Sequence, residues 1–296
     1  MLALVAGQGA LPGLILRSRP AVLVCELEGF TSDLAKDPVV FRIERLGSFL
    51  EDLKERGVTE VCFAGRVGRP ALDPSAIDAA TMPLVPRMMQ ALQAGDDGAL
   101  RLVCDIFEEA GVTVRAAHEI LPDLLPPEGV LTRKGPGRES DRDVARAVAA
   151  HAALGAADIG QAVVVAGGQV IAVEAMPGTD WMLASLLARE TVFAPTGGLL
   201  DDPLGFAADV FGGPAQTPRK RRDPALSKGG LLYKAPKPGQ DRRVDLPAIG
   251  PDTVRGAAAA DLDGIVIEAG GVIVLDREAT VSAADAAGLF LWARPV

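Results

Sequence analysis

The sequence is poor in aromatic residues, which make up 4% of its 296 residues, although hydrophobic residues make up 49%. The core must therefore be built mainly from Ala, Val, Leu and Ile. A core of this composition is typical of the helices and buried strands of an α/β protein. The length suits two ordinary domains or one large one.

Cysteine and histidine are also scarce. Cys25, Cys62 and Cys104 each lie in an apolar stretch and form no CxxC pair. This pattern argues against a disulfide framework or a zinc site and favours buried thiols in a reducing compartment. The two histidines, His118 and His151, occur in no DxH or HxH arrangement, which argues against a histidine-rich dinuclear phosphoesterase centre. We expect His151, on a helix with apolar neighbours, to be structural.

Several other signals are missing. No apolar run approaches the roughly 20 residues that a membrane-spanning helix needs. The apolar residues 2–6 are interrupted by Gly7 and have no basic leader, so we expect no signal peptide and a cytoplasmic location. The net charge of -9 argues against sequence-independent nucleic-acid binding. No GxSxG elbow or GxxxxGK[ST] loop occurs, so acyl-serine chemistry and a P-loop ATPase are unsupported.

The first residues indicate the start of a doubly wound sheet. Residues 2–6 predict a buried strand, residues 7–9 a turn, residues 10–17 a helix, and residues 21–25 a second strand. In such sheets ligands lie at the carboxyl ends of the strands, and phosphate meets a helix N-terminus. This places Gly7, Gln8, Gly9 and Leu11 among the candidate substrate-binding residues.

The glycine spacing in this turn leaves two alternatives open. Gly7, Gly9 and Gly13 are spaced one residue longer than the dinucleotide fingerprint. The turn can be a tight connection without a ligand, or part of an NAD site in which Glu26 or Glu28 accepts from the ribose.

Further candidates follow the next predicted elements. Residues 45–56 fit an amphipathic helix that ends at Gly57, and residues 58–64 predict a strand. Gly65 and Arg66 follow this strand, where the guanidinium of Arg66 can reach a phosphate or a uracil carbonyl.

Asp96 or Asp97 precedes a helix predicted over 99–110, as a cap or as a ligand contact. Residues 112–116 predict a further strand, and the polar link over 131–140 indicates a domain boundary.

The second half predicts a mixed sheet. After a helix over 141–153, residues 163–174 and 265–276 each predict a β-branched hairpin hinged on Gly-Gly, which is either a local repeat or a chance recurrence. A helix over 180–189 follows the first hairpin. We expect Thr179 to cap that helix, Gly178 to admit an anion to its first amides, and Glu174 to lie beside this turn.

Residues 191–227 predict a long excursion rich in Gly, Pro and Asp. It ends in a basic run, Arg219 to Arg222, which is either a solvated loop or a contact for anionic lipid headgroups.

The most distinctive segment is 228–250. Residues 231–235 predict a short strand, and Pro236 and Pro238 end it because proline cannot donate to a ladder. Residues 242–246 predict a second strand by alternation. The lysines of this segment suit phosphate and its carboxylates suit Mg²⁺. A solvated surface hairpin is the alternative.

This segment also carries a resemblance. Its run KAPKPGQD followed by RVDLPAIG resembles the signature of the LpxI family, and GQGALP at residue 7, GDD at residue 95 and VEAMPGTD at residue 173 support the likeness. The resemblance implies an N-terminal Rossmann-like parallel-sheet domain, 1–132, and a C-terminal catalytic α/β domain, 133–296. It also implies Mg²⁺-dependent hydrolysis of the lipid UDP-2,3-diacylglucosamine to UMP and 2,3-diacylglucosamine 1-phosphate in lipid A biosynthesis.

The chemistry then assigns roles to particular residues. A diphosphate needs charge neutralisation and an oriented water. We predict Asp241, Asp245 and Glu174 as metal ligands and Lys237 as a further catalytic residue. The resemblance implies an acid where Ala225 stands, so we expect a variant of low activity. The predicted substrate-binding residues of this half are Gly178, Thr179, Asp180, Lys234, Gly239, Gln240 and Arg243, and Asp97 joins those of the first half.

Two other functions stay open, an NAD(P)-binding oxidoreductase and a non-catalytic acyl-lipid carrier. We expect transient contact with the cytoplasmic face of the inner membrane and no nucleic-acid partner, and a homo-oligomer stays open.

Overall fold

In the computed structural model, the first half of the chain folds around a parallel five-stranded sheet. The structure describes residues 1–32, 34–68, 72–93, 96–187 and 222–295, without the side chains of 92–97. The strand order is β3-β2-β1-β4-β5, and each neighbouring pair is parallel. The strands are β1 (Leu2–Ala6), β2 (Leu23–Leu27), β3 (Val39–Phe41), β4 (Glu60–Ala64) and β5 (Thr113–Val114). The predicted Rossmann-like parallel sheet is confirmed.

Helices cover both faces of this sheet because its central strand is apolar on both sides. Ala3 and Val5 of β1 face a cluster built with α2 (Leu46–Glu55) and α4 (Asp96–Glu109). Leu4 and Ala6 face the opposite cluster, which includes Ile15 of α1 (Ala10–Ser18) and Ala117 of α5 (Ala117–Ile120). α3 (Val85–Gln93) packs beside α4. Short 3-10 turns occupy 43–45, 74–76, 82–84 and 122–124.

The second half forms a six-stranded mixed sheet, as predicted. Its order is β6-β13-β11-β9-β7-β8, parallel at β9-β11-β13 and antiparallel elsewhere. α6 covers one face, and the other face is covered by α7, α9 and α10. The elements are β6 (Gly129–Val130), α6 (Ser140–Ala156), β7 (Ala162–Ala166), β8 (Gln169–Val173), α7 (Thr179–Ser185), β9 (Leu231–Lys234), α9 (Pro251–Ala259), β11 (Gly264–Glu268), α10 (Arg277–Ala287) and β13 (Phe290–Arg294).

One of the two predicted hairpins is correct. β7 and β8 pair antiparallel around Gly167 and Gly168, which have φ of 58° and 77°. The second hairpin, over 265–276, is wrong. β11 lies between β9 and β13, while β12 (Ile273–Val274) pairs in parallel with β10 (Ala248–Ile249) in a separate sheet. A strand as fully apolar as β11 is buried on both faces in the centre of a parallel array, and both of its edges are already paired.

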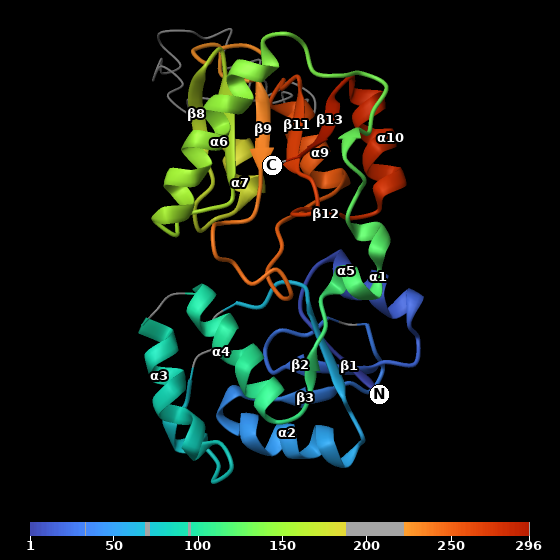
Figure 1. Ribbon diagram of the computed structural model, residues 1–296, viewed down its shortest axis with the longest axis vertical. Coiled ribbons are helices and arrows are strands. Elements are labelled where there is room, and N and C mark those ends of the chain that lie inside the picture. Colours follow the sequence, from blue (N-terminus) through green and yellow to red (C-terminus); the bar gives the residue numbers. More distant parts are fainter. Residues whose placement is uncertain (33, 69–71, 94–95, 188–221, 296) are drawn as a thin grey trace, which may run out of the picture.

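The two domains meet at the carboxyl ends of the first sheet (Figure 1). The chain after β9 extends from the second domain to the first, where Val244 packs beside the α2–α4 cluster. Ile273 of β12 is buried with Ala117 of α5. β6 pairs with β13, so residues 129–130 join the second sheet just before the predicted boundary at residue 132.

Other features bear on the sequence predictions. Cys25, Cys62 and Cys104 are free and buried, as predicted. None of the described helices combines the length and apolarity needed to cross a bilayer. Most of the predicted 191–227 excursion lies outside the described residues, as does the basic run except for Arg222.

Candidate functional site

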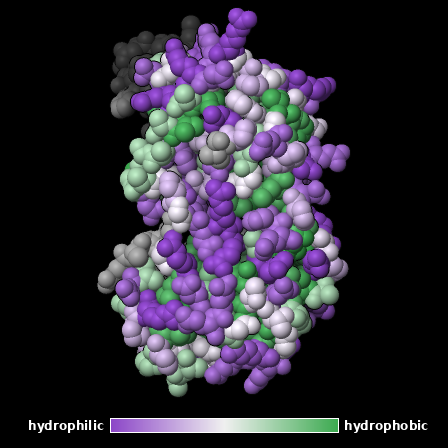
Figure 2. All heavy atoms as spheres, viewed as in Figure 1, coloured by the Kyte–Doolittle hydropathy of each residue, from purple (hydrophilic) through white to green (hydrophobic). Residues whose placement is uncertain are grey.

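A pocket of about 350 Å³ lies between the two domains. A volume of this size is within the range of small-molecule sites. Figure 2 shows hydrophilic side chains gathered along the centre of the viewed face, over the region where the domains meet. The first domain lines the pocket with Gln8, Gly9, Ala10, Leu11, Phe63, Ala64, Gly65, Arg66, Ala117 and His118, and the second with residues 242–246, Ala248, Ile273 and Leu275.

Two glycine-containing turns form the first-domain wall. Gly7 N–H donates to the carbonyl of Ala64 at 2.8 Å, and the backbones of Gln8 and Arg66 exchange hydrogen bonds of 2.9 and 2.8 Å. A Cβ on Gly7 would lie 2.6 Å from the carbonyl oxygen of Arg66, so this approach requires glycine. The joined turns place the N-terminus of α1 and the side chain of Arg66 at the same edge of the sheet.

The second-domain wall is a loop where a strand was predicted. Residues 242–246 are not a strand, because Val244 N–H and Asp245 N–H both donate to the Asp241 carbonyl and close a turn. The alternation that suggested a strand has another origin. Val244 and Leu246 pack with apolar clusters of the first domain, and Asp245 between them lines the pocket.

The charged side chains of this loop are held in place by ion pairs. Arg243 binds Asp241 within the loop at 2.7 Å and Glu108 of α4 at 2.5 Å. The hydrogen bond from Arg243 lowers the pKa of Asp241, and Asp241 raises the pKa of Arg243. Arg242 pairs with Glu268 at 2.8 Å. Arg66 differs from these arginines: its side chain is exposed and pairs with no carboxylate of the described residues.

The loop that precedes Asp241 is held by its own side chains and by the first domain. Gln240 accepts from the backbone N–H of Lys237 at 2.8 Å, and its amide donates to Asp245. Lys237 Nζ lies 2.5 Å from Asp158, beyond the end of α6. Arg101 of α4 donates to the carbonyl of Gly239 at 3.1 Å. The contact from Arg101 holds the loop against the first domain, and the other contacts fix it within the second.

Lys234 lies away from the interdomain pocket. It is 7% exposed, and its ammonium donates to Thr179 Oγ1 at 2.7 Å. Thr179 donates in turn to Glu174 at 2.8 Å, and Glu174 also accepts from the N–H of Gln161. Burial lowers the pKa of Lys234, opposed by the nearby charges of Glu174 and Asp180.

The predicted cap of α7 is wrong. Gly178 is the N-cap residue, with φ of 88°, and Thr179 is the first helical residue. The threonine hydroxyl accepts from Lys234 and donates to Glu174, and it does not bond the helix amides. Asp180 is exposed on the same turn.

The predicted metal ligands are not gathered in one place. Asp241 binds Arg243, Asp245 binds Gln240, and Glu174 binds Thr179. Among the described residues, no group of three or more His, Cys, Asp or Glu is arranged to hold a metal ion. Of these acids, Asp245 lines the interdomain pocket. The assignment of these residues to a metal stays a prediction.

Ala225 and Asp97 stand apart from the pocket lining. Ala225 is exposed, and its N–H donates to Asp223 at 2.9 Å. The neighbouring Arg222 binds the carbonyls of Gly229 and Ala260, so this segment lies near the amino-terminal ends of β9 and β11. Asp97 lies in the first turn of α4, and its side chain is outside the description.

Sequence reasoning assigned no role to His118. This histidine lines the interdomain pocket, as Arg66 does, and its Nδ1 is buried with no hydrogen-bond partner among the described residues. It follows β5, at the carboxyl edge of the first sheet, so its place after a predicted strand was the available signal. His151 has partners instead: its Nε2 lies 2.9 Å from the Ala235 carbonyl, and its ring contacts Tyr233.

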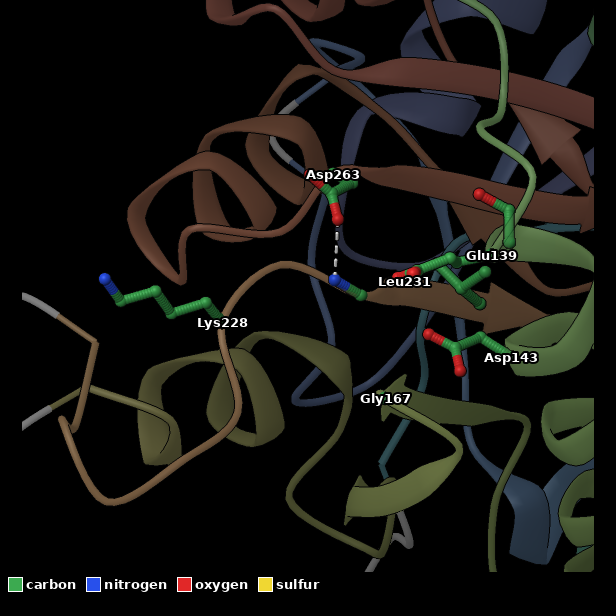
Figure 3. A pocket seen from close by; sticks show the side chains of 8 residues that line it. Glu139, Asp143, Gly167, Lys228, Leu231 and Asp263 are labelled. Atoms are coloured by element: carbon green, nitrogen blue, oxygen red, sulfur yellow. Dashed lines mark hydrogen bonds between the residues drawn. The ribbon is translucent and has the colours of Figure 1, made fainter.

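A second pocket, of about 110 Å³, lies at the amino-terminal end of β9 (Figure 3). Its carboxylates hold nearby turns: Asp263 accepts from Gly230 N–H at 2.8 Å, and Asp143 accepts from Gly168 N–H at 2.6 Å. Lys228 extends away from these acids in Figure 3. Asp143 and Asp263 of this pocket therefore stabilise the turns beside it.

Fold and site together define a two-domain α/β protein whose pocket lies at the carboxyl edge of a Rossmann-like sheet. Its residues 1–124 match the model of the LpxI N-terminal domain, and residues 127–292 match that of the LpxI C-terminal domain. The chain belongs to the LpxI family. It is 36% identical over 301 residues to the UDP-2,3-diacylglucosamine pyrophosphatase LpxI of Caulobacter vibrioides (strain ATCC 19089 / CIP 103742 / CB 15), covering 98% of this chain and 96% of the relative.

Proposed function

We propose that this protein hydrolyses the diphosphate of UDP-2,3-diacylglucosamine to UMP and 2,3-diacylglucosamine 1-phosphate in lipid A biosynthesis. The observation that carries the proposal is the match to both LpxI domains, together with a relative of that name aligned over 98% of the chain. The interdomain pocket supports it because arginines, a helix N-terminus and polar side chains converge there.

The reaction follows from the chemistry of a diphosphate. The oxygen of water forms a bond to one phosphorus as the bond from that phosphorus to the bridging oxygen breaks, and the other phosphate leaves as an anion. Arg66 lacks a carboxylate partner among the described residues, so its charge is available to phosphate oxygens. The first amides of α1 face the same pocket. Together they offset the charge that separates in the transition state.

Mg²⁺ is part of the proposal. When bound, the ion would neutralise charge on the phosphate oxygens. The described residues do not form a ready-made cage, but Mg²⁺ is commonly held by one or two carboxylates together with substrate phosphates. Asp245, which lines the pocket, fits that mode. Asp241 and Glu174 remain proposed ligands.

The proposal also covers location, oligomeric state and level of activity. The lipid substrate calls for transient contact with the cytoplasmic face of the inner membrane by an otherwise cytoplasmic protein. A homo-oligomer is also proposed. We also propose that the protein has low activity, because Ala225 stands where the family resemblance implies an acid.

The oxidoreductase alternative has less support. Glu26 is 2% exposed and accepts from the backbone and hydroxyl of Ser32, and Glu28 pairs with Arg42 at 3.2 Å. Both acids that could accept from a ribose are therefore engaged.

Incubation with UDP-2,3-diacylglucosamine and Mg²⁺ tests the proposal. We expect UMP and 2,3-diacylglucosamine 1-phosphate in equal amounts, and no saturable binding of NADH. Binding of the lipid without turnover, indifferent to the UDP group, would favour the carrier alternative.

A further inference from the structure

The inference concerns His118, which is partly buried and makes no side-chain hydrogen bond with the part of the chain that the structure describes. Its Nδ1 is shielded from solvent and has no hydrogen-bond partner among the described residues. A buried nitrogen without a partner is unusual, and it restricts where the ring can carry its proton. The other histidine shows the contrast, because His151 bonds the Ala235 carbonyl at 2.9 Å.

The surroundings of His118 point to a ligand rather than to folding. α5 is anchored without it: Ala117 is buried in the apolar cluster, and Glu119 accepts from the Ala116 N–H at 2.9 Å. Arg115 pairs with Glu119 and Glu60. The histidine side chain is therefore not needed to hold its own helix in place.

A second unpaired group lies in the same pocket. Arg66 is exposed there and has no carboxylate partner among the described residues, whereas Arg242 and Arg243 are each paired. The first residues of α1 line the same pocket. A cation, an imidazole and helix amides all match the oxygens of a phosphate group.

The tautomer of His118 follows from its burial. A hydrogen on Nδ1 would be a buried donor with no acceptor, which folded proteins rarely tolerate. The proton of the neutral ring therefore belongs on Nε2, which is left as a donor. A donor in the pocket that Arg66 also lines is suited to a non-bridging phosphate oxygen.

We propose that His118 is a substrate-contacting residue that donates a hydrogen bond to the diphosphate of the bound nucleotide, acting with Arg66 from the first domain. The proposal rests on the proposed function for the identity of the ligand, and it adds a residue to that site. No bond is made or broken by His118 in this role.

The test uses UDP and uridine as probes, because they differ only in the diphosphate. Titration calorimetry of the full chain measures the Kd of each for wild type, His118→Ala and His118→Gln. We expect His118→Ala to weaken UDP binding by about tenfold or more, since hydrogen bonds to charged groups contribute about 1.5–3 kcal/mol. His118→Gln retains an N–H donor and should recover part of this loss. Uridine binding should not change.

Thermal unfolding of the variants provides the control for folding. We expect both His118 variants to unfold within a few degrees of wild type, because no side-chain hydrogen bond joins His118 to the described residues. A UDP Kd within twofold of wild type in His118→Ala would overturn the proposal. Equal losses for UDP and uridine would also overturn it, as would a wild-type protein that does not bind UDP. Failure of wild type to hydrolyse the UDP-lipid, with the UDP result intact, would count against the proposed function alone.

Discussion

Arg243 and Glu108 form an ion pair between the two domains, with Nη1 and Oε1 2.5 Å apart. The same guanidinium also binds Asp241 of its own loop. Arg243 was predicted to contact substrate, and it lines the pocket, but its charge is already shared with two carboxylates. Its structural role is to hold the loop of the second domain against α4 of the first.

The first prediction follows from this pair. Arg243→Ala should lower the free energy of unfolding by about 1 kcal/mol, because it removes a partly exposed pair and loosens the loop. Urea unfolding measures the change. Glu108→Gln should show part of the loss, and the double variant should lose less than the sum of the two. The matched control is Arg242→Ala, whose partner Glu268 lies in the same domain. Strict additivity of the two changes would contradict the interdomain pair.

The second prediction concerns Glu44 and pH. The hydrogen bond from Arg42, together with the backbone N–H of Asp73, lowers the pKa of Glu44 from 4.5 to about 2. A carboxyl whose pKa is lower in the folded state contributes stability above its unfolded pKa, and this contribution is lost as pH falls from about 4.5 towards 2. Glu44→Gln should therefore destabilise the protein at pH 7 by about 1.5–3 kcal/mol, the size of a hydrogen bond to a charged group.

Denaturant unfolding of wild type and Glu44→Gln at pH 7 and pH 3 checks this. The difference between the two proteins should shrink as the pH falls. A difference that stays constant, or grows, would show that Glu44 contributes through packing and not through its charge.

The third prediction concerns the thiols. Burial raises the pKa of Cys25 and Cys62 to about 12 and that of Cys104 to about 11. The thiolate is the reactive form, so the native protein should not react with a disulfide reagent such as DTNB at pH 8. All three thiols should react after unfolding in guanidinium. Rapid labelling of any one of them in the native state would mean that its strand, or for Cys104 its helix, is more open than described.

The fourth prediction tests position 225. If an acid there is a metal ligand, Ala225→Asp should raise Mg²⁺-dependent UMP release by about a hundredfold, the effect of one strong electrostatic group on a transition state. Affinity for the UDP-lipid should change much less. Equal turnover by the two proteins would remove position 225 from the catalytic machinery. That outcome would agree with its exposed place near the amino-terminal ends of β9 and β11.

The sequence was sufficient for features that depend on local pattern. The apolar run of β1 followed by Gly7 and Gly9 predicted the first strand and turn, and the Gly65–Arg66 connection was correctly placed after a strand. These succeed because parallel strands end at the same edge of a sheet, so ligand-facing turns can be inferred before the fold is known.

Features that depend on long-range packing were not predictable in this way. Val244 and Leu246 alternate like a strand, yet they pack against the other domain. Lys234 looked available for phosphate, yet the sheet buries it against Thr179. His118 drew no attention because an unpaired nitrogen is visible only once its surroundings are built.

The most direct test of the account is UMP release from UDP-2,3-diacylglucosamine by wild type, Arg66→Ala and Arg255→Ala. Arg255 is an exposed arginine of α9 whose partner is the neighbouring Asp252, so its variant controls for the loss of one positive charge. The account predicts UMP release by wild type and by Arg255→Ala, and a kcat/KM about a hundredfold lower for Arg66→Ala. Absence of UMP release by wild type, or full activity in Arg66→Ala, would contradict hydrolysis of a diphosphate in the interdomain pocket.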